Sequence, residues 1–386
     1  MTVVSTPAVA ADLFADAVLA HPYGAYRAIR DTGPAVYVPE HRLWVLSRYR
    51  EVRDALLRPD VFAAPHGAGL LDLGVPAAAP PAPSPPAPAA SALTAGFPKD
   101  LETLVVNQAE KLVDDLVSRG SFDAVADLAH PFPLRTIGDL IGLPADARTD
   151  LVTCAEASLQ ANAPLDERTL RALMDLEGVF TRLTTDLTTG PAASLTTGLT
   201  TGPAADPAPV PPCPTSHLLK TFAMPCVHTI ASGLSAMLWL LATHPDAWHA
   251  LRTTPSLVAA AVEESLRLET PVQMLTRTTT RDVLVGDTLI RTGDRVLLLI
   301  AAANRDPRKW PDPDHYDIRR NPTDHLSLGH GTQSHLIATL TKTHLRAILG
   351  ALVHRASALY LDGSPRRRIT PTTRAFASLP LYATHR

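Results

Sequence analysis

The stretch VEESLRLETPVQ, residues 262–273, decides how the rest of this chain is read. Glu264 and Arg267 lie three residues apart, so on a helix over Leu257–Leu268 they share one face and can pair directly. Such pairs also occur on solvated helix surfaces, so the pair alone decides little. Its context decides more, because strand-like and helical segments follow it in a regular order.

Downstream, Asp282–Ile290 and Arg295–Ile300 are β-rich runs, and Gly293 in the stretch between them predicts a hairpin there. A helix is expected at Leu336–His354, followed by a β-like tail. Upstream, Phe222–Ala242 is a long apolar helix, which we interpret as buried in a core and not as a membrane span.

The first half of the chain is mostly helical, with one strand pair and two low-complexity segments. A Pro-dense sequence predicts an extended, mobile segment at 75–92, and a Thr/Pro-rich sequence predicts a flexible insert at 187–214. We expect one domain, 1–386, mainly α with small β-hairpins. The further elements expected are strands at Ala35–Val38 and Leu43–Ser47, and helices at Glu51–Leu57, Leu101–Arg119, Val125–Leu143 and Thr149–Leu187.

Composition excludes several classes of protein. Lys plus Arg total 35 against 38 Asp plus Glu, a formal charge of -3, which argues against nucleic-acid binding. The cysteines Cys154, Cys213 and Cys226 have no zinc spacing, and no basic, apolar leader begins the chain. We therefore expect a cytoplasmic protein with no metal site, no nucleic-acid partner and no membrane partner.

The order of these motifs resembles the cytochrome P450 superfamily, in its bacterial soluble branch. The resemblance is carried by VEESLRLETPVQ, Arg277, IRTGDRVLLLIAAANRDPRKWPDPDHYDIRR at 290–320 and HLSLGHG at 325–331. It implies a cytochrome P450-like fold and positions for the haem machinery. Under it, Glu264, Arg267 and Arg320 form a structural triad, Arg277 and His325 occupy haem-propionate positions, and His228 and Thr229 lie in the oxygen groove.

The haem loop departs from the pattern of the family. Where the family has a phenylalanine, a basic residue, the ligating cysteine and a glycine, this chain has Leu328, Gln333, His335 and Ile337. A branched side chain at 337 is expected to obstruct the haem face. Without a thiolate, cleavage of the O–O bond in the manner of the family is not expected.

The distal helix and the propionate clamp depart as well. Pro225 and His228 replace the glycine-containing turn and the acid of the family, and Cys226 aligns on the distal helix, where it cannot replace the thiolate. The helix that supplies further propionate ligands is replaced by the Pro/Ala stretch after Gly74.

Two hypotheses follow from these departures. The first is a chain without cofactor or catalytic residues that activates or stabilises a deoxysugar glycosyltransferase in actinobacterial secondary metabolism, because the family includes haem-free members with this role. The alternative is a haem-binding protein or unusual oxidase with His335 as axial ligand, since imidazole is a common haem ligand. No GxSxG, phosphate-loop or dinucleotide fingerprint is present to support a hydrolase, kinase or dehydrogenase.

Overall fold

The computed structural model describes residues 12–64, 101–141, 224–330 and 334–386, together with Leu143, Ala145 and Arg148. The two low-complexity segments, the helix expected at Thr149–Leu187, Cys154 and Cys213 lie outside the described residues.

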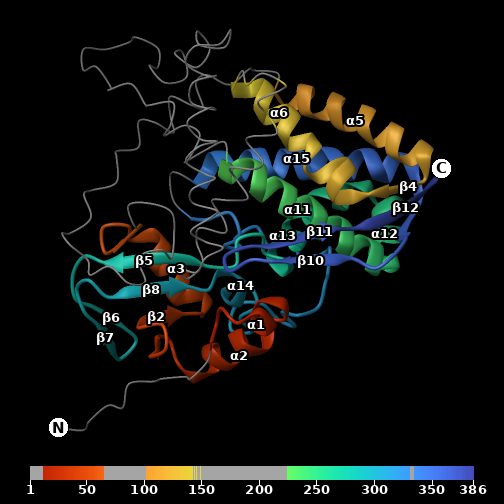
Figure 1. Ribbon diagram of the computed structural model, residues 1–386. Helices are drawn as coiled ribbons and strands as arrows, with labels where there is room; N and C mark the ends of the chain where they lie inside the picture. Colours follow the sequence, from red (N-terminus) through yellow and green to blue (C-terminus); the bar gives the residue numbers. More distant parts are fainter. Residues whose placement is uncertain are drawn as a thin grey trace, which may run out of the picture.

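The larger part of the described chain is a bundle of helices around one apolar core (Figure 1). In this bundle α15 packs against α5, α11 and α13, and α6 and the π-helix η2 pack against α11. The sequence predicted most of these helices within a few residues, because their apolar side chains recur at helical spacing. The helices of this part are α5 (Leu101–Arg119), η2 (Ala124–Ala129), α6 (Pro131–Ile141), α11 (Met224–Thr243), α12 (Pro245–Thr253), the 3-10 turn η4 (Pro255–Leu257), α13 (Val258–Leu268) and α15 (Ser334–Arg355).

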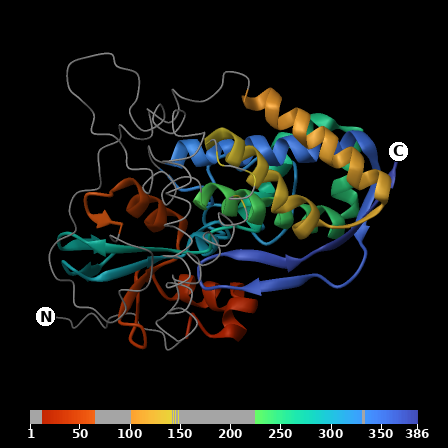
Figure 2. The ribbon, with the colours of Figure 1, turned by 45° about the horizontal axis from the view of Figure 1, so that its top comes forward.

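A five-stranded sheet forms the second part, which Figure 2 shows beside the bundle. Its strand order is β1-β2-β8-β5-β3, and only the β2–β8 pair is parallel. Four short helices pack near the sheet. The elements are α1 (Asp16–Ala20), α2 (Tyr23–Thr32), β1 (Val36–Val38), β2 (Leu43–Leu46), α3 (Tyr49–Leu57), β3 (Phe62–Ala63), β5 (Leu275–Thr279), β8 (Arg295–Leu298) and α14 (Ile300–Ala303).

The hairpin expected across residues 291–294 is wrong. Instead β6 (Val283–Val285) pairs with β7 (Thr288–Ile290), and β8 pairs with β2 and β5. The turn lies at Gly286, whose φ of 59° suits a two-residue hairpin connection. The Asp294 carboxylate accepts hydrogen bonds from Trp44 Nε1 on β2 and from the Arg291 backbone. Residues 291–294 therefore connect the β6–β7 hairpin to the five-stranded sheet.

The C-terminal tail is β-structure, as predicted. Strand β12 (Pro380–His385) lies between β4 (Ser121–Asp123) and β9 (Ala356–Leu361) in one small sheet. A second pair consists of β10 (Arg366–Ile369) and β11 (Arg374–Ser378).

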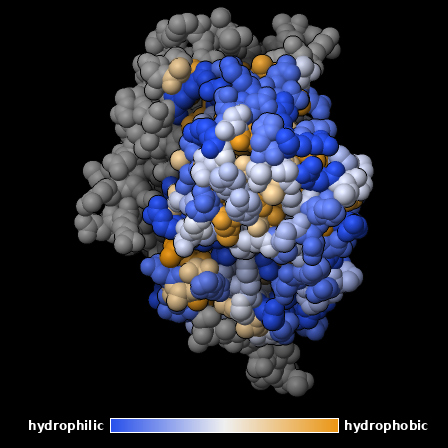
Figure 3. All heavy atoms as spheres, turned by 90° about the vertical axis from the view of Figure 1, so that its right-hand side faces the viewer, coloured by the Kyte–Doolittle hydropathy of each residue, from blue (hydrophilic) through white to orange (hydrophobic). Residues whose placement is uncertain are grey.

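Within the described part of the chain, two helices are long and apolar enough to cross a membrane, Pro225–Thr243 and Leu336–Arg355. Of their apolar windows, 78% and 61% are buried inside the protein, so core packing accounts for their composition. The face in Figure 3 is mainly hydrophilic, with apolar residues in small separate patches.

Candidate functional site

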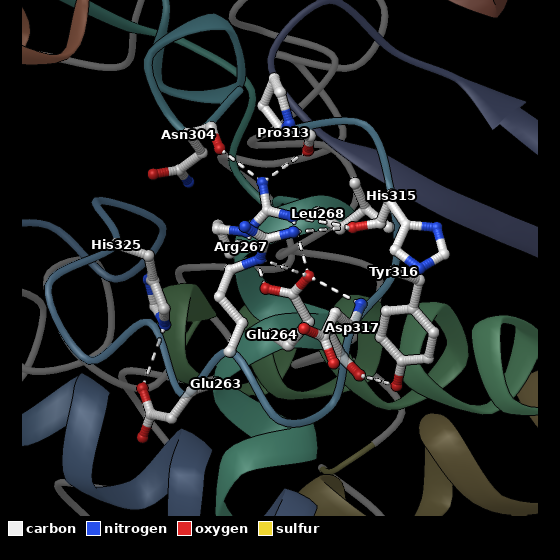
Figure 4. Close-up of polar contacts among 12 residues, drawn as sticks. Glu263, Glu264, Arg267, Leu268, Asn304, Pro313, His315, Tyr316, Asp317 and His325 are labelled. Atoms are coloured by element: carbon white, nitrogen blue, oxygen red, sulfur yellow. Dashed lines mark hydrogen bonds and ion pairs between the residues drawn. The ribbon is translucent and has the colours of Figure 1, made fainter. Parts of the chain in front are cut away.

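The structure brings Glu264, Arg267 and Arg320 together where the segment that precedes His325 packs against α13. Figure 4 shows the contact of Glu264 with Arg267. Arg267 Nε lies 2.7 Å from Glu264 Oε2, and Arg320 Nε lies 3.1 Å from Glu264 Oε1. The side chains of Glu264 and Arg267 are completely buried. A charge at this depth is tolerated because each has a partner.

Backbone carbonyls satisfy the remaining guanidinium hydrogens of the triad. Arg267 Nη1 donates to Asn304 O at 2.8 Å and Pro313 O at 2.7 Å, and Arg320 donates to the carbonyls of Pro311 and Asp312. The triad therefore fixes the course of residues 304–320 against α13, which is a structural role.

His325 and Arg277, predicted to share a propionate-binding role, have different surroundings. His325 Nε2 lies 3.3 Å from Glu263 Oε2, and its Nδ1 accepts a hydrogen bond from Ser327 N at 3.2 Å. Burial lowers the pKa of His325, and the neighbouring Glu263 carboxylate opposes this shift. Both ring nitrogens thus contact the protein itself.

Arg277 on β5 has no carboxylate contact within the described residues. Its Nη1 donates to the Thr276 carbonyl at 2.7 Å, and burial lowers the pKa of the guanidinium. A cation that is shielded from water and lacks a counter-ion suits an acidic ligand. The carboxylate of a haem propionate has the chemistry that this position lacks.

Position 335 lies in the first turn of α15, and the described part of the loop before this helix extends to His330. In that loop Leu328 is buried in the main core, and Gly329 has a φ of 79°. Ile337 is partly buried against the same core. Position 335 is thus a histidine where the family resemblance places a thiolate, and imidazole nitrogen is a haem-iron ligand in other proteins.

The distal helix α11 carries the other residues that the resemblance singles out. Burial raises the pKa of the Cys226 thiol, so this buried cysteine is not a thiolate at neutral pH. Burial, with His130 and Arg368 nearby, lowers the pKa of His228 to about 3. His228 is therefore neutral at pH 7 and does not replace the acid of the family as a proton donor. Thr229 is 6% exposed.

The described part of the chain contains no group of three His, Cys, Asp or Glu side chains that could hold a metal ion.

The sequence did not single out the first glutamate of the motif, Glu263. It contacts Lys342, Arg346 and His325 and is almost fully buried. The signal that was available is the pair of adjacent glutamates, together with two basic residues four apart on the later helix.

Comparison with known proteins shows what this architecture is similar to. Residues 255–325 match the family model described as "Cytochrome P450". The chain is 31% identical to cytochrome P450 CYP199A2 of Rhodopseudomonas palustris, with 98% of this chain and 95% of the relative covered. It is 32% identical to cytochrome P450 130 of Mycobacterium tuberculosis, over 87% of this chain and 88% of the relative.

Solved structures match along almost the whole chain. Cytochrome P450 CYP109Q5 from Chondromyces apiculatus is 25% identical with a TM-score of 0.79, over 98% of this chain and 99% of that one. P450BioI, in a complex with an acyl carrier protein, superposes with a TM-score of 0.77 at 22% identity over 95% of this chain and 100% of that one, which shows a shared fold.

These comparisons correct the expectation that the chain has no cofactor. That expectation is wrong, because relatives of this similarity, over nearly their whole lengths, are cytochromes P450, which typically bind haem. The departures at Gln333, His335 and Ile337 fall in the haem loop of the family frame, whereas the contacts among Glu264, Arg267 and Arg320 are present. The buried guanidinium of Arg277, which has no carboxylate contact among the described residues, is consistent with this correction.

Proposed function

This chain belongs to the cytochrome P450 family, and we propose that it is a haem-binding member in which His335 takes the place of the thiolate ligand. The observation that carries this proposal is the histidine in the first turn of α15, at the position of the cysteine in the family frame. The frame contains a second imidazole at His330, but His335 is the residue at the position of the cysteine.

Different residues of the chain would bind the iron and the propionates of haem. His335 would provide the nitrogen ligand on the proximal side, and Arg277 would pair with a propionate. When bound, haem supplies a redox-active iron, and an imidazole ligand does not give it the electron density that a thiolate gives for O–O cleavage. The chain is therefore proposed to bind haem without the monooxygenase activity named for some of its relatives.

The absorbance spectrum of the purified protein tests this proposal. We expect a Soret band and a ferrous–CO maximum at the position of an imidazole-ligated haem, and both should be lost in His335→Ala. His330→Ala, a neighbouring histidine in the preceding loop, is the matched control and should keep the band. A protein without a Soret band, or one whose band survives in His335→Ala, would contradict the proposal.

A second candidate function is the activation of a glycosyltransferase in actinobacterial secondary metabolism. It is supported by the retention of the Glu264, Arg267 and Arg320 framework in a chain that has lost the thiolate needed for monooxygenation. A partner that binds the active state of a transferase raises its activity by shifting populations. Bound haem is compatible with this role as a structural group.

Co-expression with the glycosyltransferase encoded nearest to this gene tests the second candidate. A co-purifying complex with higher transferase activity is expected. Separate elution of the two proteins, with equal transferase activity in the presence and absence of this chain, would contradict it.

A further inference from the structure

Glu263 holds three basic side chains although it is almost completely buried. Its Oε2 lies 2.8 Å from Lys342 Nζ and 3.3 Å from His325 Nε2, and its Oε1 lies 3.1 Å from Arg346 Nη2. Burial raises the pKa of Glu263, but hydrogen bonds and charges from His325 and Lys342 outweigh this, so its pKa lies below the ordinary value. The carboxylate is therefore charged at neutral pH.

The partners of Glu263 come from the two segments that flank position 335. His325 begins the loop before it, and Lys342 and Arg346 lie on α15 after it. In the same loop, Ser327 Oγ donates to Leu266 O at 2.6 Å, which is a second contact between this loop and α13. Both sides of position 335 are thus attached to α13, and Figure 4 shows the His325 contact.

The spacing of these residues along α15 determines which face of the helix is held against α13. Lys342 and Arg346 follow His335 by seven and eleven residues, which are close to two and three helical turns. Positions 342 and 346 therefore each lie within about 20° of position 335 around the helix axis, one on either side. A carboxylate that holds positions 342 and 346 fixes the rotation of the helix, and with it the face that carries position 335.

We propose that Glu263 is a positioning residue that fixes the rotation of α15, and with it the helix face that carries the proposed ligand at position 335, an inference that rests on the proposed function. Lys342, whose side chain is 25% exposed, and the buried His325 are its stronger partners. Arg346 is 46% exposed and contributes less, because water screens its charge.

Glu263→Gln in the haem-loaded protein tests this inference against a matched control, Glu269→Gln. Glu269 is equally buried and also has three basic partners, but these are Arg305, Arg367 and Arg374, none of which lies on α15. Both variants should unfold at a lower temperature. Only Glu263→Gln should change the ferric electron paramagnetic resonance g-values, release haem at least about tenfold faster and speed amide exchange in residues 336–345.

Each outcome decides the inference. If Glu263→Gln has the same g-values and α15 exchange as Glu269→Gln, Glu263 is only structural and the inference is overturned. If Glu263→Gln does not fold, Lys342→Met, which removes a partly exposed partner, should give the same spectral change, and an unchanged spectrum would overturn the inference. If the wild type has no Soret band, the proposed function is wrong and Glu263 has no ligand to position. Amide exchange in α15 then still shows whether Glu263 anchors the helix.

Discussion

Arg267 and Glu264 form a bidentate ion pair, and both side chains are completely buried. Arg267 Nε contacts Glu264 Oε2 at 2.7 Å, and Arg267 Nη2 contacts Glu264 Oε1 at 2.8 Å. Because water cannot replace either partner, the loss of one leaves a buried charge without compensation.

Glu264→Ala should therefore lower the free energy of unfolding by about 3–5 kcal/mol. Denaturant unfolding followed by circular dichroism measures this change. Asp54→Ala is the control, because Asp54 pairs with Arg58 at 3.1 Å on an exposed face, where an ion pair contributes less than about 1 kcal/mol. A Glu264→Ala protein as stable as the control variant would show that the triad does not hold the fold.

Ile337→Gly should increase the fraction of purified protein that carries haem. The substitution removes a branched side chain where the family has a glycine, two residues after the proposed ligand. It should also lower the free energy of unfolding by about 1 kcal/mol or more, since glycine weakens a helix and a core contact is lost. Haem content per protein, measured by the pyridine haemochrome assay, checks the first effect, and an unchanged or lower content would contradict it.

Arg277→Met should weaken haem retention by about tenfold or more, because a charge-assisted hydrogen bond to a propionate is lost. The haem-free protein should not lose stability, since Arg277 is shielded from water and has no carboxylate contact among the described residues. Haem transfer to apomyoglobin and thermal unfolding measure the two effects.

Arg281→Met is the control for this variant, because Arg281 is largely exposed and pairs with Asp60 at 2.8 Å. It should retain haem like the wild type. Equal rates of haem loss from the Arg277 and Arg281 variants would mean that Arg277 does not contact the propionate.

The sequence predicted elements whose pattern is local and missed relationships that depend on distant partners. Helix α5 was predicted at its observed bounds because its apolar residues follow one stripe. Strand β8 was assigned to the wrong partner because nothing in residues 291–298 indicates that β2, some 250 residues earlier, lies beside it. The turn at Gly286 was the stronger local signal.

The candidate site divides in the same way. Glu264, Arg267 and Arg320 could be predicted because the motif spacing of a known family identifies them. The contact of His325 with Glu263 could not, because a histidine side chain suits a propionate and a carboxylate partner equally well in sequence. The contact between His325 and Glu263 is seen only in the structure, where both side chains are buried.

His344 joins α15 to α6 through a buried hydrogen bond. Its Nδ1–H donates to Leu340 O at 2.7 Å, so its Nε2, 2.6 Å from Thr136 Oγ1, is the acceptor. Burial lowers the pKa of His344 to about 4 from its ordinary 6.5. The imidazole is therefore neutral in the folded protein at pH 7.

The stability of the protein should consequently fall as the pH decreases from about 6.5 to 4. In this range the unfolded chain binds a proton at His344 and the folded protein does not, so acid favours unfolding, by on the order of 3 kcal/mol from this residue. His344→Gln keeps a hydrogen-bond acceptor for Thr136 but cannot be protonated, so its free energy of unfolding should depend less on pH. His354→Gln, an exposed histidine of the same helix, should follow the wild type. Denaturant unfolding of the three proteins at pH 7, 5.5 and 4.5 checks this, and parallel pH curves for the wild type and His344→Gln would show that His344 does not resist protonation in the fold.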